Sequence, residues 1–222
     1  MDECYLTEQN MSAKADEWLN NLSIPSSRKK KFTFIPENSA LLIIDMQEFF
    51  LNEQSHAFVP SAKTIVPNIN SLIKKYRKQE YPIIFTFYAL ESDESPGIMG
   101  RWWGDVLRVT NSLSRIHSSL NLENNDIIIR KSRYSAFIET NLEEILKENK
   151  VSTLVITGIM THLCCESTAR EAFMRDYEVY FVVDATAADT EALHVSSLRT
   201  LTDGFAIPVK TNTILEVVKN IG

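Results

Sequence analysis

The sequence predicts a three-layer α/β/α fold in which helices cover both faces of a six-stranded, mostly parallel, doubly wound sheet. Short apolar runs without polar alternation recur along the 222 residues, as expected for strands that are buried on both faces. Segments with helical spacing separate most of these runs, which is typical of βαβ crossovers. A chain of this length can bury a sizeable hydrophobic core.

Six apolar runs are expected to form the strands. They are residues 40–45, 82–88, 126–130, 153–157, 179–184 and 206–210. Helices are expected over residues 62–79, 135–148, 166–175, 190–202 and 212–220. Because the two sets alternate almost throughout, the strands are expected to pair in parallel.

Two segments lie outside this alternation. Residues 1–38 are polar and lack strong periodicity, so we expect an N-terminal arm with one short helix around residues 13–22, ahead of a domain of residues 39–222. Residues 89–125 form a connection longer than a packed domain needs between two strands. Loops of that length usually act as lids or binding loops.

The composition excludes several classes of partner. A net charge of −6 and a pI near 5.3 disfavour nucleic acids and anionic membranes, because both would be repelled. The basic run Arg28–Lys31 is expected to be a solvated stretch. No segment has the apolar length of a signal peptide or a membrane span, so we expect a soluble, cytoplasmic protein. Three cysteines, two of them adjacent, do not make a disulfide framework.

Polar side chains follow the predicted strands, at the sheet edge where open parallel sheets bind ligands. Asp45 ends the first strand, Lys131 follows the third, and Cys164 opens the helix after the fourth. Asp184 ends the fifth strand. Each also has an ordinary structural interpretation, as a capping carboxylate, a surface cation or a small buried hydrophobe.

Cys164 has the strongest physical case for chemistry. A thiol in the first turn of a helix faces unpaired N–H groups and the positive end of the helix dipole, and both favour the thiolate. A nearby Lys131 would favour it further. Cys165 is expected to be a buried hydrophobe, and a disulfide between these adjacent residues is disfavoured by geometry.

Three motifs together resemble the isochorismatase-like cysteine hydrolase superfamily. They are LLIIDMQEFF at residues 41–50, RKSRYSAF at 130–137 and GIMTHLCCESTAREAF at 158–173. The resemblance implies a Rossmann-type parallel sheet, a catalytic triad of Asp45, Lys131 and Cys164, and homo-oligomers. It also implies a non-proline cis peptide bond at Ile159–Met160, next to an oxyanion site made by backbone N–H groups near Met160 and Cys164.

The resemblance implies no cofactor, and one departure bears on metal binding. Nicotinamidase relatives carry metal-binding histidines after the second strand, whereas residues 89–99 contain no histidine. The other histidines are scattered in the sequence, so no metal site is expected.

Three functions follow from the motifs. The first is a metal-independent cysteine hydrolase that cleaves a non-peptide C–N bond of a small molecule through a thioester on Cys164. The second is an isochorismatase proper, which cleaves a vinyl ether by protonation from Asp45 and leaves the thiol unused; KSRYSAF and the Thr-His-Leu before Cys164 look more like that branch. The third is an inactive interaction module with residues 1–38 as the partner-binding arm.

Substrate specificity is expected to reside in residues 47–60 and 89–125. Residues 55–61 with the tryptophan pair can line a pocket for a small planar or carboxylated substrate, although tryptophans pack into cores equally often. The candidate substrate contacts are Gln47, Phe50, His56, Trp102, Trp103, Arg133, Tyr134 and His162.

Overall fold

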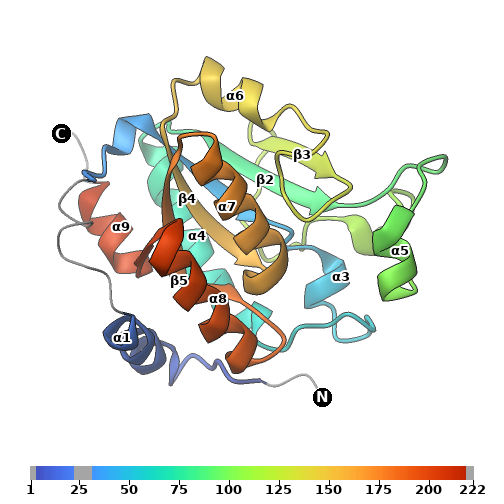
Figure 1. Cartoon of the computed structure of the whole chain (residues 1–222), viewed down its shortest axis with the longest axis horizontal. Helices are drawn as coiled ribbons and strands as arrows, with labels where there is room; N and C mark the ends of the chain where they lie inside the picture. Colours follow the sequence, from blue (N-terminus) through green and yellow to red (C-terminus); the bar gives the residue numbers. More distant parts are fainter. Residues whose placement is uncertain (1–3, 23–31, 219–222) are drawn as a thin grey trace.

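A computed structural model describes residues 4–22 and 32–218, so the basic run at residues 28–31 lies outside the described residues. The described chain forms a six-stranded sheet in the order β3-β2-β1-β4-β5-β6, with every neighbouring pair parallel (Figure 1). The strands are β1 (Ser39–Ile44), β2 (Ile83–Tyr88), β3 (Ile127–Lys131), β4 (Thr153–Ile159), β5 (Glu178–Ala187) and β6 (Ile207–Val209). The predicted fold class is confirmed.

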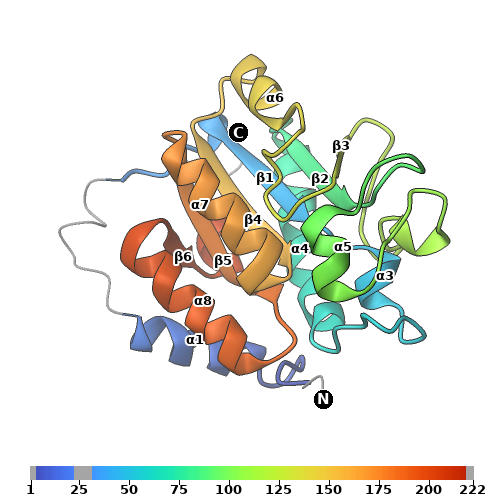
Figure 2. The ribbon, with the colours of Figure 1, turned by 45° about the vertical axis from the view of Figure 1, so that its right-hand side comes forward.

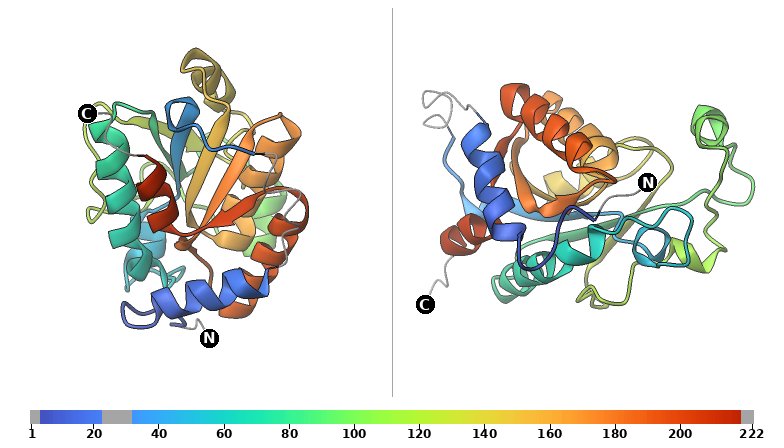
Figure 3. Two further views of the ribbon diagram at one scale, coloured as in Figure 1. Left: turned by 90° about the vertical axis from the view of Figure 1, so that its left-hand side faces the viewer. Right: turned by 90° about the horizontal axis from the view of Figure 1, so that it is seen from below.

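Helices cover both faces of this sheet, as Figure 1 and the view from below in Figure 3 show. α7 (Glu166–Met174) and α8 (Glu191–Gly204) lie on one face, and α4 (Ala62–Lys78) and α9 (Thr211–Val217) lie on the other. The shorter helices are α3 (Glu48–Leu51), α5 (Gly97–Trp103) and α6 (Leu142–Glu148), with 3₁₀ turns at Pro36–Asn38 and Ser112–Ser114. None of the helices described is long and apolar enough to cross a bilayer.

The central strands are buried because their side chains are apolar on both faces. All six residues of β1 and all seven of β4 are buried, and the two strands pair from Ser39 with Thr153 to Ile44 with Gly158. Gly158 has φ +108°, and a Cβ there would lie 2.0 Å from the carbonyl oxygen of Ile44. Only glycine therefore lets β4 approach β1 this closely, at the point where the chain leaves β1.

Two predicted boundaries are wrong. The helix expected over residues 135–148 begins only at Leu142, because the backbone N–H groups of Ala136 and Phe137 bond to the hydroxyls of Thr168 and Ser135 instead of starting a helix. The fifth strand does not end at residue 184. It continues to residue 187, because a register shift lets it resume pairing with β4.

The described part of the N-terminal arm packs on the same sheet. α1 (Met11–Asn21) includes the predicted short helix and lies beside α8, as the left view of Figure 3 shows. Tyr5, Leu6 and Trp18 are buried and belong to the same hydrophobic core as the central strands. The domain boundary at residue 39 stays a prediction, but this segment of the arm is part of the packed body.

The long connection between β2 and β3 contains α5, which projects from the body near the end of the sheet where β2 and β3 finish (Figure 1) and comes to the front in Figure 2. Three of its large apolar side chains, Ile98, Trp102 and Trp103, are exposed, and Trp102 is 77% exposed. The connection is anchored at its base by Arg130, whose guanidinium donates to both carboxylate oxygens of Glu94 at 2.8 and 2.9 Å.

Candidate active site

The predicted triad lies where the strand order reverses. β1 and β4 are neighbours, and the connections leaving them run to opposite sides of the sheet, which is where open α/β sheets bind ligands. Asp45 directly follows β1, Lys131 ends β3, and Cys164 lies five residues after the last residue of β4. The structure brings all three side chains together.

Asp45 is fully buried, and its backbone is held in the left-handed region at φ +50°. Such a conformation costs a residue other than glycine on the order of 1–3 kcal/mol, so surrounding contacts have to maintain it. The Asp45 N–H donates to the carbonyl of Thr86 at 3.2 Å, and the Thr86 hydroxyl donates to Asp45 Oδ1 at 2.7 Å. Thr86 thereby fixes the carboxylate from the neighbouring strand.

Lys131 connects the other two members of the triad. Its Nζ lies 2.7 Å from Asp45 Oδ2 and 3.3 Å from Cys164 Sγ, and it also donates to the carbonyl of Arg133 at 2.8 Å. The side chain is only 1% exposed. Burial alone would lower the pKa of Lys131, but the charge of Asp45 and the hydrogen bonds to Asp45 and Cys164 outweigh it and raise the pKa, so the ammonium stays protonated.

Cys164 lies in a single π-helical turn, η3 (Thr161–Cys165), that precedes α7, and not in the first turn of α7 itself. Turns of this kind are frequent at functional sites. Burial opposes the thiolate that the helix start and Lys131 were expected to favour. Burial raises the pKa of Cys164 to about 12, and Asp45 raises it further by charge and hydrogen bonding, while Lys131 only partly opposes them. The site therefore holds a protonated thiol beside a carboxylate that can accept its proton.

The backbone just before Cys164 also matches what the resemblance implied. The peptide bond between Ile159 and Met160 is cis, as the resemblance implied. Cys165 is fully buried, and its thiol lies 3.9 Å from the carbonyl of Thr157. The described cysteines, Cys4 included, are free thiols.

A cavity of about 260 Å³ opens onto Cys164. It is lined by Phe49, Phe50, His56, Ala57, Phe58, Tyr88, Met99, Trp103, Asp105, Leu107, Tyr134, Met160, Leu163, Cys164 and Asp189. Most of these residues come from the two segments expected to carry specificity. The predicted contacts Phe50, His56, Trp103 and Tyr134 are among them, and the Trp103 indole N–H donates to the Tyr134 hydroxyl at 2.7 Å.

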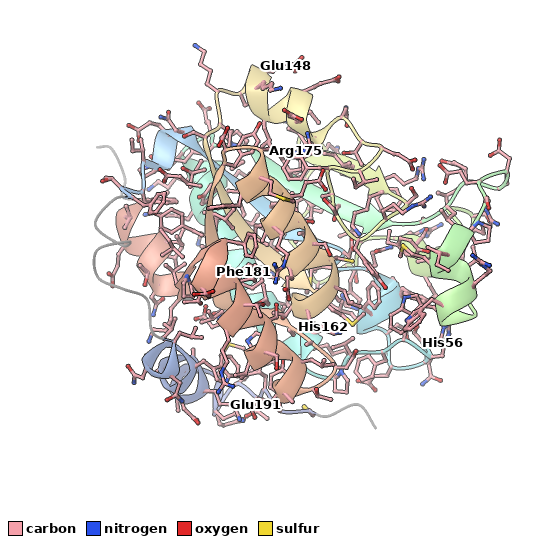
Figure 4. All side chains as sticks on the ribbon, in the orientation of Figure 1. His56, Glu148, His162, Arg175, Phe181 and Glu191 are labelled. Atoms are coloured by element: carbon pink, nitrogen blue, oxygen red, sulfur yellow. The ribbon has the colours of Figure 1, made fainter. Side chains whose placement is uncertain are left out.

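The other four predicted substrate contacts do not line this cavity. The Gln47 side-chain amide forms hydrogen bonds within the protein: its Nε2 donates to the carbonyls of Tyr88 and Ser114, and its Oε1 accepts from the Tyr88 N–H. Trp102 points to the outer surface of α5. Arg133 donates to the carbonyl of Ser132, and His162 is partly buried near the start of α7 (Figure 4).

Asp184, which the strand-end argument also selected, has a structural role. Its Oδ1 accepts from both the backbone N–H and the hydroxyl of Thr211, at 2.7 and 2.8 Å, and so caps the start of α9.

His56 lies close to α5 in Figure 4 and is paired with Asp105 at 2.9 Å.

Sequence reasoning missed two residues of the candidate site. Thr86 carried a signal, because it is the one hydroxyl in the otherwise apolar run that precedes Tyr88. Asp189 carried none, because its place in the cavity wall depends on how β5 ends. Within residues 4–22 and 32–218, no three His, Cys, Asp or Glu side chains are grouped so that they could hold a metal ion.

Comparison with known proteins gives a consistent result. A model of the isochorismatase domain matches residues 39–213. Nicotinamidase 3 of Arabidopsis thaliana is 37% identical over 171 residues, which cover 76% of this chain and 82% of that protein. Enterobactin synthase component B of Escherichia coli K12 is 33% identical over 172 residues, and the match covers 77% of this chain but only 60% of that protein.

Among solved structures, a cysteine hydrolase from Pseudomonas syringae pv. phaseolicola superposes with a TM-score of 0.80. The two are 25% identical, and the superposition covers 84% of this chain and 95% of the other.

Proposed function

The chain belongs to the isochorismatase family of hydrolases, and on that premise we propose that it is a cysteine amidohydrolase that cleaves the C–N bond of a small, planar amide. One observation carries the proposal: the cluster of Asp45, Lys131 and Cys164 opens onto an aromatic cavity, and no lysine or arginine is among its lining residues in the described part of the chain.

The first half of the reaction forms a thioester. The Asp45 carboxylate accepts the proton of the Cys164 thiol as Sγ attacks the amide carbonyl carbon. The carbonyl oxygen becomes an oxyanion, for which the backbone N–H groups of Met160 and Cys164 at the cavity wall are the proposed donors. When the tetrahedral intermediate collapses, the C–N bond breaks and Asp45 gives its proton to the leaving amine.

The second half consumes water and restores the enzyme. Asp45, again a carboxylate, takes a proton from water as the water oxygen attacks the thioester carbonyl. Collapse of this intermediate releases the carboxylic acid, and the departing Cys164 sulfur recovers its proton from Asp45. Throughout, the Lys131 ammonium stabilises whichever of its two neighbours is negative, because it lies within 3.3 Å of both.

The cavity supports an uncharged substrate. Its wall is dominated by aromatic rings, which suit a flat molecule, and its acidic members are Asp105 and Asp189. Isochorismate carries two carboxylates, which would have to be buried beside these acidic groups, and the lining residues that the structure describes include no arginine or lysine. The isochorismatase relatives of this chain therefore support the proposed fold and type of chemistry more than they support isochorismate as the substrate.

The test compares ammonia release from benzamide and nicotinamide with pyruvate release from isochorismate, for wild type and for Cys164→Ala. We expect wild type to hydrolyse at least one amide and Cys164→Ala to lose activity by about 10³-fold or more, because the nucleophile is removed. Cys165→Ala is the matched control, since it removes the neighbouring buried thiol, and it should retain amidase activity.

Two outcomes would contradict the proposal. Pyruvate release by both wild type and Cys164→Ala would identify a vinyl-ether hydrolase in which the thiol is unused. Absence of both activities, with folded protein, would favour an interaction module.

A further inference from the structure

The turn that carries the candidate nucleophile is packed on one side and open on the other. Met160, Leu163 and Cys164 line the cavity, so this side of η3 faces the space that a substrate would occupy. Thr161 and Cys165, on the other side of the turn, are fully buried. The position of the Cys164 sulfur relative to the rest of the triad therefore depends on the residues that bind η3 from behind.

Two side chains of α8 bind Thr161 at two of its polar groups. The Nδ1 atom of His194 lies 2.9 Å from the Thr161 hydroxyl oxygen, and the Ser197 hydroxyl donates to the Thr161 carbonyl at 3.2 Å. His194 and Ser197 are three residues apart, so they lie on the same face of the helix. Because Thr161 is the first residue of η3, α8 fixes this turn at the point where it begins.

His194 is in turn packed against the N-terminal segment. It is fully buried, and its ring centroid lies 4.4 Å from that of Trp18 and 5.8 Å from that of Tyr5. Figure 2 shows α1, which carries Trp18, beside α8. Burial lowers the pKa of His194 to about 3, so the imidazole is neutral and acts on Thr161 through a hydrogen bond. The family model begins at residue 39, so this support lies outside the shared domain.

We propose that His194 is a positioning residue for Cys164, that it acts through Thr161, and that Trp18 of the N-terminal segment holds the imidazole in place. A nucleophile reacts efficiently only from a near-attack geometry, and a displacement of about 1 Å can lower the rate on the order of 10²-fold. The inference rests on the proposed amidase function and adds a residue to it, but its first test needs no turnover.

The first test measures how well the turn protects its thiol. His194→Phe keeps an aromatic ring against Trp18 and removes both nitrogens, and Thr161→Val removes only the hydroxyl. In both variants η3 should open more often, so iodoacetamide should label Cys164 about fivefold faster than in wild type. Cys165 should stay unlabelled, because it lies in the core and becomes accessible only if the protein unfolds. Tandem mass spectrometry assigns the label between the two adjacent cysteines.

The second test uses an amide that wild type hydrolyses. His194→Phe and Thr161→Val should lower kcat by about 10- to 100-fold and leave KM within about twofold, because the substrate still binds while the thiol is misplaced. Thr161→Ser retains the hydroxyl and should stay within about threefold of wild type. Thr202→Val is the matched control, since it removes a buried α8 hydroxyl that bonds to none of the described residues, and its kcat should be unchanged.

Combined variants test the route of the effect. His194→Phe with Thr161→Val should lose no more kcat than the more severe single variant, and Trp18→Leu should change labelling and kcat in the same directions as His194→Phe. The inference is overturned if Cys164 labelling is unchanged in both single variants, if Cys165 is labelled as fast as Cys164, or if the losses in kcat simply add. Should no amide be hydrolysed, the labelling rates still decide, so failure of the amidase proposal can be told apart from failure of this one.

Discussion

Lys131 is a buried cation with two partners, and the protonation of the site follows from that geometry. Its Nζ contacts Asp45 Oδ2 and Cys164 Sγ. The single ammonium can therefore stabilise one negative charge, on either the carboxylate or the sulfur. Burial raises the pKa of Cys164 to about 12, which favours a protonated thiol in the resting site. In the proposed mechanism, Asp45 is the base that accepts the thiol proton.

Alkylation by iodoacetamide tests this assignment, since only the thiolate reacts. A pKa raised to about 12 means that Cys164 is a thiol at pH 7, so its alkylation rate should rise about tenfold per pH unit across pH 6–9. Asp45→Asn removes the charge that raises this pKa and leaves Lys131, so alkylation at pH 7 should become faster. Peptide mass spectrometry gives both rates.

Exposed Cys4 in the same molecule is the internal reference, and its rate should not respond to Asp45→Asn. A Cys164 rate that is flat above pH 6 would mean that the resting group is already a thiolate, against this account.

At the scale of elements, Gln47 joins three segments that form the site. It follows the turn after β1, and its amide bonds to the end of β2 and to the 3₁₀ turn at Ser112–Ser114 in the long connection. The amide is fully buried, so its hydrogen bonds are made without competition from water.

Gln47→Leu should therefore lower the free energy of unfolding by about 2–3 kcal/mol, because buried backbone groups lose their partners. Urea denaturation followed by circular dichroism measures the change. Gln54→Leu, at an exposed side chain, is the matched control and should stay within about 0.5 kcal/mol of wild type. Equal stability of Gln47→Leu and wild type would show that these bonds do not hold the segments together.

Element prediction succeeded where local pattern determines structure and failed where distant contacts do. The six strands follow from continuous apolar runs, since short runs of this kind are typical of strands in a sheet covered on both faces. The late start of α6 depends on a hydroxyl of α7, Thr168, and the extra length of β5 depends on a register shift against β4. Neither partner can be identified from the local sequence.

At the scale of the whole molecule, the parallel sheet assembles the triad from positions far apart in the chain. The ends of parallel strands meet at one edge, which is why Asp45, Lys131 and Cys164 could be selected from the sequence. The cavity wall could not be predicted as completely, because the loops over that edge have no regular geometry. Four of eight candidate contacts line the cavity, and Asp189 was not among the candidates.

The most direct test of the central claim is to detect the acyl-enzyme. Wild type would be quenched in acid during turnover of a hydrolysed amide, digested, and analysed by mass spectrometry. The account predicts that the acyl group of the substrate is attached to the peptide containing Cys164 and is released by hydroxylamine, as a thioester should be. In the Cys165→Ala control, no other cysteine should carry the acyl group. Steady amide turnover with no acyl group on Cys164, under conditions that trap it in a known thioester-forming enzyme, would contradict the claim that this thiol is the nucleophile.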